Sequence, residues 1–224
     1  IPVDIGLDIL ELALIETPPT TLLLVSKAFN ALVSTIIYKT VVLDSLQKVA
    51  LFHRTIASKP PDFLATHVKT LAVTAERYTS EARTQLEDII AACNGLRTLV
   101  IPRPGVLAAT RDPRATPTEL VIQKFDAVTP FEWDPPFAHA AERPAAHLSA
   151  ALTHLRVCEP GDVWHAPRAM LEFFGALPRL THLTLARHVN APNEQNDDVF
   201  VVDVRALLEA RPALQMLVVS LFPA

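Results

Sequence analysis

Leu180-Thr181-His182-Leu183-Thr184-Leu185 is one of seven short segments that share one pattern of apolar residues. In each segment the first, fourth and sixth positions are apolar and the other three vary. The other six segments have at these positions Tyr38-Val41-Leu43, Val68-Leu71-Val73, Leu96-Leu99-Ile101, Ile122-Phe125-Ala127, Leu152-Leu155-Val157 and Leu214-Leu217-Val219. The fourth positions of adjacent segments are 26 to 34 residues apart. A repeat of this length predicts a stack of similar units, an architecture that usually binds another macromolecule.

Each segment has the alternation of a short β-strand. Its fourth and sixth residues should therefore face the core, and its third and fifth residues should face the other way. Apolar residues at helical spacing precede several segments, as in Leu86–Cys93, Leu171–Leu177 and Val204–Leu208. Pro178 and Pro212 occupy the same place between helix and strand. Helices that alternate with strands in this way predict an α/β fold with parallel strands joined by crossovers.

The repeats, over about residues 38–220, resemble the leucine-rich-repeat family in its longer, helix-containing form. The resemblance rests on the Leu-x-x-Leu-x-Leu part of the pattern. It implies a leucine-rich-repeat solenoid, with parallel strands on the concave face and helices on the convex face. The family often has Asn or Cys three places after the last apolar residue, whereas this chain has Glu76, Pro104, Pro160, His188 and Phe222. We therefore expect irregular repeats without an asparagine ladder.

Two stretches interrupt the repeat. Residues 102–151 contain eight prolines, and only Glu119–Asp126 has the character of a strand. The aromatic segment Phe131–Phe137 is compatible with a binding loop and with a flap over the edge of the core, and we expect the flap. For the polar segment Asn190–Asp198 we expect a solvated turn rather than a metal site.

Residues 1–37 lack the repeat and carry two apolar stripes at helical spacing. The first stripe lies in Ile5–Leu12. We expect a second helix, capped by Thr20 or Thr21, with an apolar face over Leu22–Val33. Two helices of this length cannot bury both stripes alone, so they must pack on the repeats, on another protein, or on both.

This N-terminal segment resembles the F-box, a helical module that binds the S-phase-kinase-associated adaptor of cullin–RING ubiquitin ligases. Ile1-Pro2-Val3-Asp4-Ile5 stands where the family has Leu-Pro-x-Glu-Ile, and Ile9-Leu10 matches its Ile-Leu pair. Leu24–Leu32 corresponds to Leu-Val-Cys-Lys-x-Trp-x-x-Leu, with Ser26 and Phe29 in place of Cys and Trp. The following segment, Ile37–Leu43, resembles the passage into the repeats of many fungal members. An F-box directly before leucine-rich repeats is a known family arrangement.

The resemblance implies two domains, an F-box-like module at residues 1–37 and a repeat domain at residues 38–224. It implies that the module binds the adaptor through apolar residues, namely Pro2, Ile5, Ile9, Leu10, Leu24, Val25, Phe29 and Leu32. The repeats would bind a protein substrate, as in the substrate-recognition adaptor of an SCF-type ubiquitin ligase, which acts by proximity. The alternative is a leucine-rich-repeat interaction scaffold whose N-terminal helices only cap the solenoid.

Residues of the concave face are the candidates for substrate binding. They are Thr70, Thr98, Lys124, His154, Arg156, His182 and Met216. Leu-Thr-His-Leu occurs in two adjacent repeats, which should bring the backbones of His154 and His182 to about 5 Å from each other. A metal site and a pH-sensitive contact are both compatible with such a pair, but we expect solvent-facing positions and no metal.

Composition argues against other classes of protein. The formal net charge of −4 and the lack of a basic run exclude a nucleic-acid interface. No apolar stretch reaches the roughly 18 residues of a membrane span. Hydrolase, metalloprotease and phosphate-loop motifs are missing, so we expect neither an enzyme nor a cofactor, and a small α/β hydrolase is the weakest hypothesis.

The two cysteines and the last repeat lead to two further expectations. Cys93 and Cys158 have neither disulfide-framework nor metal-site spacing, and Cys93 lies on an apolar helical face, where a core thiol is expected. Reduced thiols favour a cytoplasmic or nuclear protein. The last segment is followed by no polar cap, so we expect the repeat domain to be truncated at its C-terminus.

Overall fold

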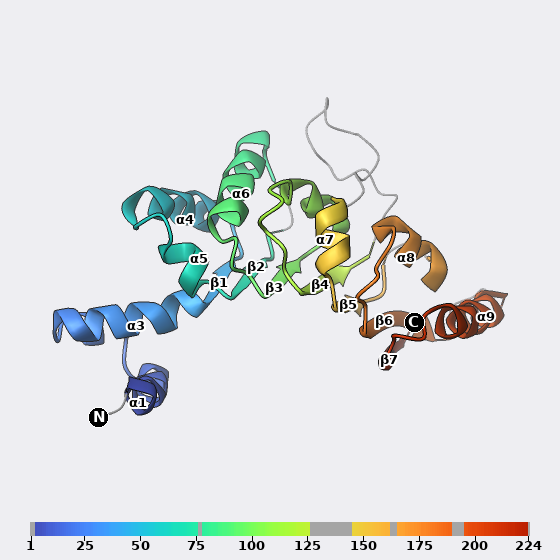
Figure 1. Cartoon of the computed structure of the whole chain (residues 1–224), viewed down its shortest axis with the longest axis horizontal. Coiled ribbons are helices and arrows are strands. Elements are labelled where there is room, and N and C mark those ends of the chain that lie inside the picture. The colour runs from blue at the N-terminus through green and yellow to red at the C-terminus, as the bar shows by residue number, and fades with distance from the viewer. Residues whose placement is uncertain (1–2, 76–77, 126–144, 162–164, 190–194, 224) are drawn as a thin grey trace.

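A computed structural model describes residues 3–75, 78–125, 145–161, 165–189 and 195–223 (Figure 1). Its described strands form one seven-stranded sheet in which all neighbours are parallel and the spatial order is the order of the chain. The strands are β1 (Thr40–Leu43), β2 (Thr70–Val73), β3 (Thr98–Ile101), β4 (Glu119–Lys124), β5 (His154–Glu159), β6 (His182–Val189) and β7 (Met216–Pro223). The prediction of an α/β fold with parallel strands joined by crossovers is therefore confirmed.

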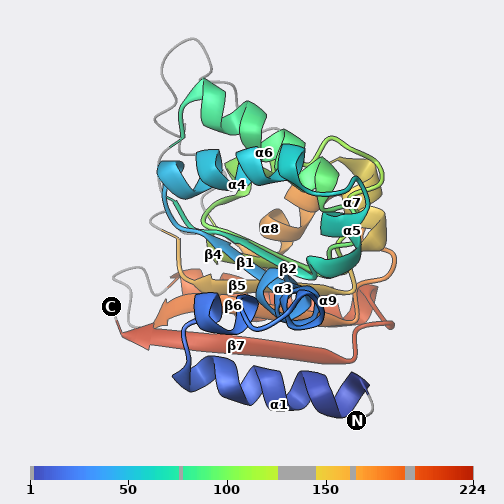
Figure 2. The same ribbon diagram turned by 90° about the vertical axis from the view of Figure 1, so that its left-hand side faces the viewer.

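Helices connect the strands on one side of the sheet. They are α4 (Leu46–Ser58), α5 (Phe63–His67), α6 (Ser80–Ala92), the 3-10 helix η1 (Pro104–Ala109), α7 (Ala146–Ala151), α8 (Pro167–Phe174) and α9 (Gln195–Ala210). Figure 2 shows α4 to α8 on the same side of the strands. Helices α6, α8 and α9 correspond to the three helices that the apolar spacing predicts. No helix in the described ranges is long and apolar enough to span a membrane.

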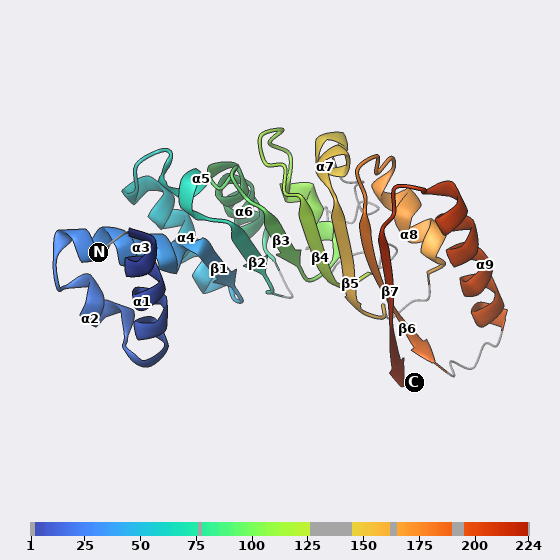
Figure 3. The same cartoon turned by 60° about the horizontal axis from the view of Figure 1, so that its bottom comes forward.

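Burial alternates along the strands, as the apolar pattern predicts. In β2, Leu71 and Val73 are fully buried beneath the helices, whereas Thr70 and Ala72 are partly exposed. The same alternation holds in β1, β3 and the first part of β5. The side of the sheet that carries Thr70, Ala72 and their equivalents is called the inner face below, and Figure 3 shows its strands as a continuous row ending at β7.

The predicted register of the fourth repeat is wrong. Leu120 and Ile122, not Phe125, pair with the core residues of β3 and β5, so the repeat begins five residues earlier than predicted. The backbone N–H of Glu119 donates to the carbonyl of Arg97 at 3.0 Å and starts the strand there. Apolar residues at 120, 121, 122 and 125 fit two alternative phases, so periodicity alone does not select one.

Of the two segments that interrupt the repeats, the structure describes part of one. Gln195–Asp198, predicted as part of a solvated turn, form the first turn of α9. The aromatic segment Phe131–Phe137 lies outside the described residues, so the choice between flap and binding loop stays a prediction.

The N-terminal helices are α1 (Val3–Glu16), α2 (Pro19–Leu23) and α3 (Lys27–Lys39). The single helix predicted over Leu22–Val33 is therefore wrong, because the chain breaks at Ser26. Ser26 has an extended backbone, and its Oγ accepts a hydrogen bond from the N–H of Phe29 at 3.1 Å, which makes it the N-cap of α3. Figure 2 shows α1 beneath α3, on the side opposite α4, and α3 continues directly into β1.

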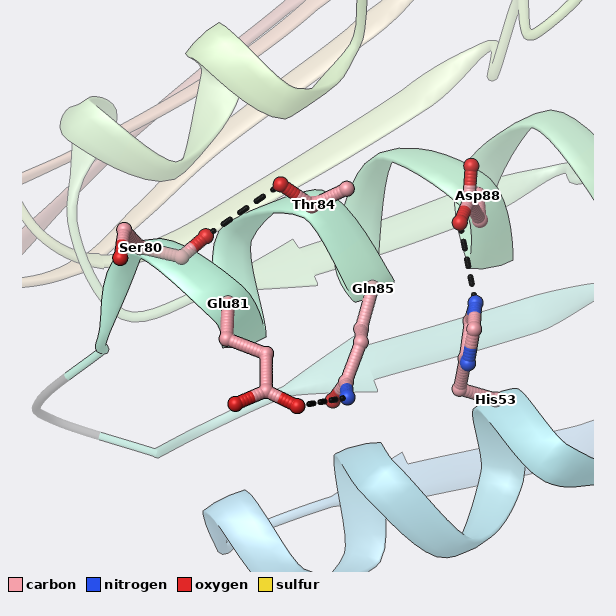
Figure 4. A network of polar contacts seen from close by, with 6 residues as sticks. All are labelled: His53, Ser80, Glu81, Thr84, Gln85 and Asp88. Carbon is pink, nitrogen blue, oxygen red and sulfur yellow. Dashed lines mark hydrogen bonds and ion pairs between the residues drawn. The ribbon is translucent and has the colours of Figure 1, made fainter.

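Neighbouring repeats are also joined through their helices. His53 Nε2 of α4 lies 2.9 Å from Asp88 Oδ2 of α6 on the outer side of the molecule (Figure 4).

Before β3 the chain passes so close to α5 that a Cβ on Gly95 would lie 2.0 Å from the carbonyl oxygen of Ala65. Glycine is therefore required at this joint.

Candidate functional site

Two surfaces carry the residues that the sequence singles out, and the first is the apolar surface of the N-terminal helices. On α1, Ile5 and Ile9 are about half exposed. Leu12 and Ile15, which are not among the predicted adaptor-binding residues, are 67% and 79% exposed. These four positions lie on one face of the helix and are called the α1 stripe below. An uncovered stripe of this kind is unusual on a helix that only packs against its own chain.

The break between α2 and α3 exposes further apolar residues. Leu24 and Val25 are 86% and 60% exposed, and Phe29 in the first turn of α3 is 38% exposed. A hollow of about 370 Å³ lies beside them, lined by Leu23, Leu24, Ser26, Lys27 and Asn30. Leu24, Val25 and Phe29 are called the α2–α3 patch below.

The predicted adaptor-binding residues therefore divide into two groups. Ile5, Ile9 and the α2–α3 patch are accessible to a partner, whereas Leu10 is 5% exposed and Leu32 is partly buried, so these two belong to the packing of the module. Pro2 lies outside the described residues.

The second surface is the inner face of the sheet, where strand register aligns the residues in rows. The first row is Thr40, Thr70, Thr98, Glu119, His154, His182 and Met216. The second row is Val42, Ala72, Val100, Val121, Arg156, Thr184 and Val218. Six of the seven predicted concave-face residues therefore do lie in these rows.

Lys124 is the exception, and its predicted place is wrong. Because β4 begins at Glu119, Glu119 stands in the first row and Lys124 pairs with Glu159 at the carboxyl end of the strand. There Lys124 lines an open hollow of about 500 Å³ together with Glu159, His188 and Phe222. The sequence did contain a signal for Glu119, since Thr118-Glu119-Leu120 parallels Thr153-His154-Leu155.

A ladder of threonine hydroxyl groups crosses the start of β4, β5 and β6. Thr153 Oγ1 donates to the carbonyl of Thr118 at 3.0 Å, and Thr181 Oγ1 donates to the carbonyl of Thr153 at 3.1 Å. Thr118 Oγ1 makes the equivalent, longer bond of 3.4 Å to Arg97. Each threonine immediately precedes a residue of the first row, so the ladder fixes the positions of Glu119, His154 and His182.

The two histidines of the first row stack on each other. Their ring centroids are 4.2 Å apart and their planes differ by 10°. Each Nδ1 lies 2.8 Å from the hydroxyl oxygen of the preceding threonine, Thr153 or Thr181. Because both rings make the same contact, they have the same orientation and their Nε2 atoms point the same way.

This network assigns the tautomer of both imidazoles. A threonine hydroxyl has one proton, and the carbonyl oxygen 3.0 to 3.1 Å away can only accept it. If that proton went to the imidazole instead, two unprotonated oxygens would face each other at hydrogen-bond distance. We therefore assign Nδ1 as the donor to the hydroxyl oxygen, which leaves Nε2 as an acceptor whenever the ring is neutral.

The same geometry argues against one metal ion shared by the two rings. A metal lies in the plane of each imidazole that binds it, along the lone pair of the nitrogen. Two nearly parallel planes 4.2 Å apart do not meet near the rings. In the described part of the chain, no group of three or more His, Cys, Asp or Glu side chains is placed to hold a metal ion.

Polar groups continue on either side of the histidine pair. Glu119 Oε2 accepts a hydrogen bond of 2.8 Å from Thr98 Oγ1, which holds the carboxylate along the first row. In the second row, Arg156 interacts with Cys158, two residues further along β5. Burial raises the pKa of the Cys158 thiol, and the hydrogen bond and charge of Arg156 offset part of this increase.

Cys93 has the properties of a core thiol rather than a nucleophile. Its side chain is fully buried at the end of α6, and burial raises the pKa of the thiol to about 12. A thiol with such a pKa carries almost no thiolate at neutral pH, so it is a poor nucleophile and a poor metal ligand.

Comparisons of this chain with protein-family models, with curated proteins and with solved structures found no match.

Proposed function

We propose that the chain is the substrate-recognition adaptor of an SCF-type ubiquitin ligase. In this proposal an F-box-like module at residues 1–37 binds the S-phase-kinase-associated adaptor. The repeat domain at residues 38–224 forms a leucine-rich-repeat solenoid and binds a protein substrate on its inner face. The chain supplies no catalytic group and acts in the cytoplasm or nucleus by placing the substrate near a ubiquitin-loaded enzyme.

The solenoid part of the proposal is supported by the order of the strands. Seven parallel strands in chain order, with α4 to α8 on one side, are what a repeated strand–helix unit produces when each copy stacks on the previous one. The strand entries repeat as well, because one carbonyl accepts two backbone N–H groups of the next strand at Lys69, Arg97, Thr118, Thr153 and Thr181.

The observation that carries the adaptor proposal is the exposed apolar surface at the positions where the sequence resembles an F-box. Leu24 and Val25 stand in the Leu-Val pair of the F-box motif, and both are largely exposed. Fully burying one such side chain contributes about 1.5–3 kcal/mol. A partner that covers both therefore gains about 3–6 kcal/mol, which is part of the free energy that specific binding requires.

The same observation weighs against a module that only caps the solenoid. A capping element turns its apolar face to the repeats and a polar face to solvent. Here α1 leaves Leu12 and Ile15 uncovered, and α1 lies on the side of α3 away from α4. Capping accounts for Leu10 and Val33, which are buried, but not for the α1 stripe.

Calorimetric titration of the chain with purified adaptor tests the proposal. We expect the wild-type chain to bind, and Leu24→Asp and Val25→Asp each to weaken binding at least about tenfold, since each leaves a carboxylate in an apolar interface. Val42→Asp is a matched control, because Val42 is 48% exposed but lies on the inner face.

Three outcomes of this titration decide whether the chain is an adaptor-binding protein. The proposal is supported if the two α2–α3 patch variants lose binding, keep the wild-type thermal transition, and the Val42 variant binds normally. It is wrong if the folded wild-type chain does not bind the adaptor. It is also wrong if Leu24→Asp and Val25→Asp bind as tightly as the Val42 control.

A further inference from the structure

We propose that Glu119, His154 and His182 form a row of hydrogen-bond acceptors that binds a basic side chain, above all arginine, of a protein partner. The inference rests on the proposed function, in which the inner face holds the substrate. It adds a chemical class of substrate and names the residues that select it.

The threonine hydroxyl groups determine which nitrogen of each histidine is free to accept a hydrogen bond. The threonine ladder uses the proton of each hydroxyl group on the preceding strand, so the hydroxyl oxygens of Thr153 and Thr181 accept from Nδ1. In this assignment each imidazole presents an Nε2 lone pair when the ring is neutral. The two histidines are equivalent acceptors rather than one donor and one acceptor.

The carboxylate of Glu119 adds a third acceptor beside the two histidines. Glu119 is the direct register partner of His154, as His154 is of His182. Neighbouring strands are about 4.8 Å apart, so the backbones of the three residues stand at regular, short intervals along the first row. Thr98 occupies one lone pair of Glu119 Oε2, and the other acceptor positions of that carboxylate remain for a ligand.

A row of acceptors next to a carboxylate is complemented by a cation with several N–H donors. A guanidinium has five N–H donors, no acceptor and a permanent positive charge, so it donates to two neighbouring acceptors at once and neutralises Glu119. An acidic or phosphorylated side chain has only acceptors and would face a carboxylate and two lone pairs. Arg156 interacts with Cys158 and lies in the second row, so it does not supply the missing donor within the row.

Nuclear magnetic resonance of the full chain labelled with ¹⁵N-histidine tests the tautomer directly. At about pH 8, where free imidazoles are neutral, we expect Nδ1 of His154 and His182 to carry the proton and Nε2 to be bare. Thr153→Val should release this constraint for His154 and leave His182, held by Thr181, unchanged. A proton found on Nε2 of both rings in the wild type would overturn the inference.

Titration with acetyl-Gly-Arg-Gly-amide then tests the ligand. We expect this peptide to shift the Nε2 signals of both histidines, and its citrulline analogue, which has the same shape without charge, to bind at least about tenfold more weakly. Glu119→Gln keeps an acceptor for Thr98 and should weaken binding of the arginine peptide by about the same factor. Thr70→Val, in the same row but two strands from Glu119, is the control and should bind normally.

Equal affinity for the arginine and citrulline peptides, or tighter binding of acetyl-Gly-Glu-Gly-amide, would overturn the inference. Adaptor binding measured on the same samples separates the two proposals. If the adaptor binds and the arginine peptide does not, only this inference fails. If the arginine peptide binds and the adaptor does not, the ligase function fails and the acceptor row stands as a binding site of another kind.

Discussion

Cys93 shows how the environment of a single residue sets its chemistry. The side chain is fully buried in the core beneath α6, and desolvation disfavours its thiolate. The pKa of the folded thiol is raised from 9.0 to about 12. Between these values the unfolded chain loses the thiol proton and the folded chain keeps it, so the free energy of unfolding falls as the pH rises.

We therefore predict a pH-dependent loss of stability that Cys93 causes. In a Cys158→Ser background, raising the pH from about 8 to about 10 should lower the free energy of unfolding by about 1 kcal/mol more with Cys93 present than with Cys93→Ala. Urea unfolding at the two pH values measures this difference, and other titrating groups cancel in the comparison. Equal pH dependence in the two proteins would show that the thiol is accessible to water.

At the scale of the helix and strand, the break at Ser26 gives the N-terminal module its exposed residues. Pro18 is the N-cap of α2, which ends at Leu23, and Ser26 is the N-cap of α3. The chain between the two helices turns Leu24 and Val25 outward. A continuous helix would place these two residues on the faces dictated by its 3.6-residue period instead. The α2–α3 patch is thus a consequence of capping.

Replacing Ser26 tests this role. Ser26→Ala removes the acceptor for the Phe29 N–H and should destabilise the start of α3 by about 1 kcal/mol. Native-state hydrogen exchange at the amides of Phe29 and Asn30 measures the change. Ser26→Thr keeps the acceptor and should exchange at nearly the wild-type rate. Indistinguishable exchange in Ser26→Ala would mean that tertiary packing, not the cap, begins α3.

Within the described residues of the whole molecule, each strand pairs through backbone hydrogen bonds only with the strands before and after it in the chain. In the proposed solenoid, stability is therefore close to a sum over units and their interfaces. Local damage should spread to the adjoining repeats and fade with distance along the row. The proposed adaptor-binding surface on the N-terminal helices and the proposed substrate-binding surface on β4 to β6 should then tolerate changes independently.

Core truncation at one end of the sheet tests this behaviour. Leu71→Ala in β2 removes a fully buried side chain and should cost about 2–5 kcal/mol. We expect faster hydrogen exchange in β1 to β3 and little change in β6 and β7. Leu183→Ala in β6 is the matched variant and should reverse the pattern. Uniform acceleration across all seven strands in both variants would indicate one cooperative unit instead.

The extent to which the sequence predicts this protein differs between the repeats. Leu71, Leu99, Leu155 and Leu183 each stand in an unambiguous alternation, and all four are buried with the predicted neighbours. The predicted register of the fourth repeat is wrong because its apolar residues fit two phases of the repeat. In addition, β4 is joined to β3 by η1 rather than by a longer helix. The wrong register placed Lys124 in the first row of the inner face, where the structure has Glu119.

The sequence by itself determined the α/β class, the parallel connection and the inner-face rows outside β4, because burial of alternate residues follows from the apolar pattern alone. Only the tertiary structure decided the register of β4, the break at Ser26 and the stacking of the two histidines. Such features depend on hydrogen bonds between residues that are distant in the sequence and that the apolar pattern does not pair. Examples are the bonds of Glu119 with Arg97 and of Thr153 with Thr118. Hydrophobic periodicity is read from one segment at a time, whereas register and side-chain contacts are fixed by the neighbouring strand.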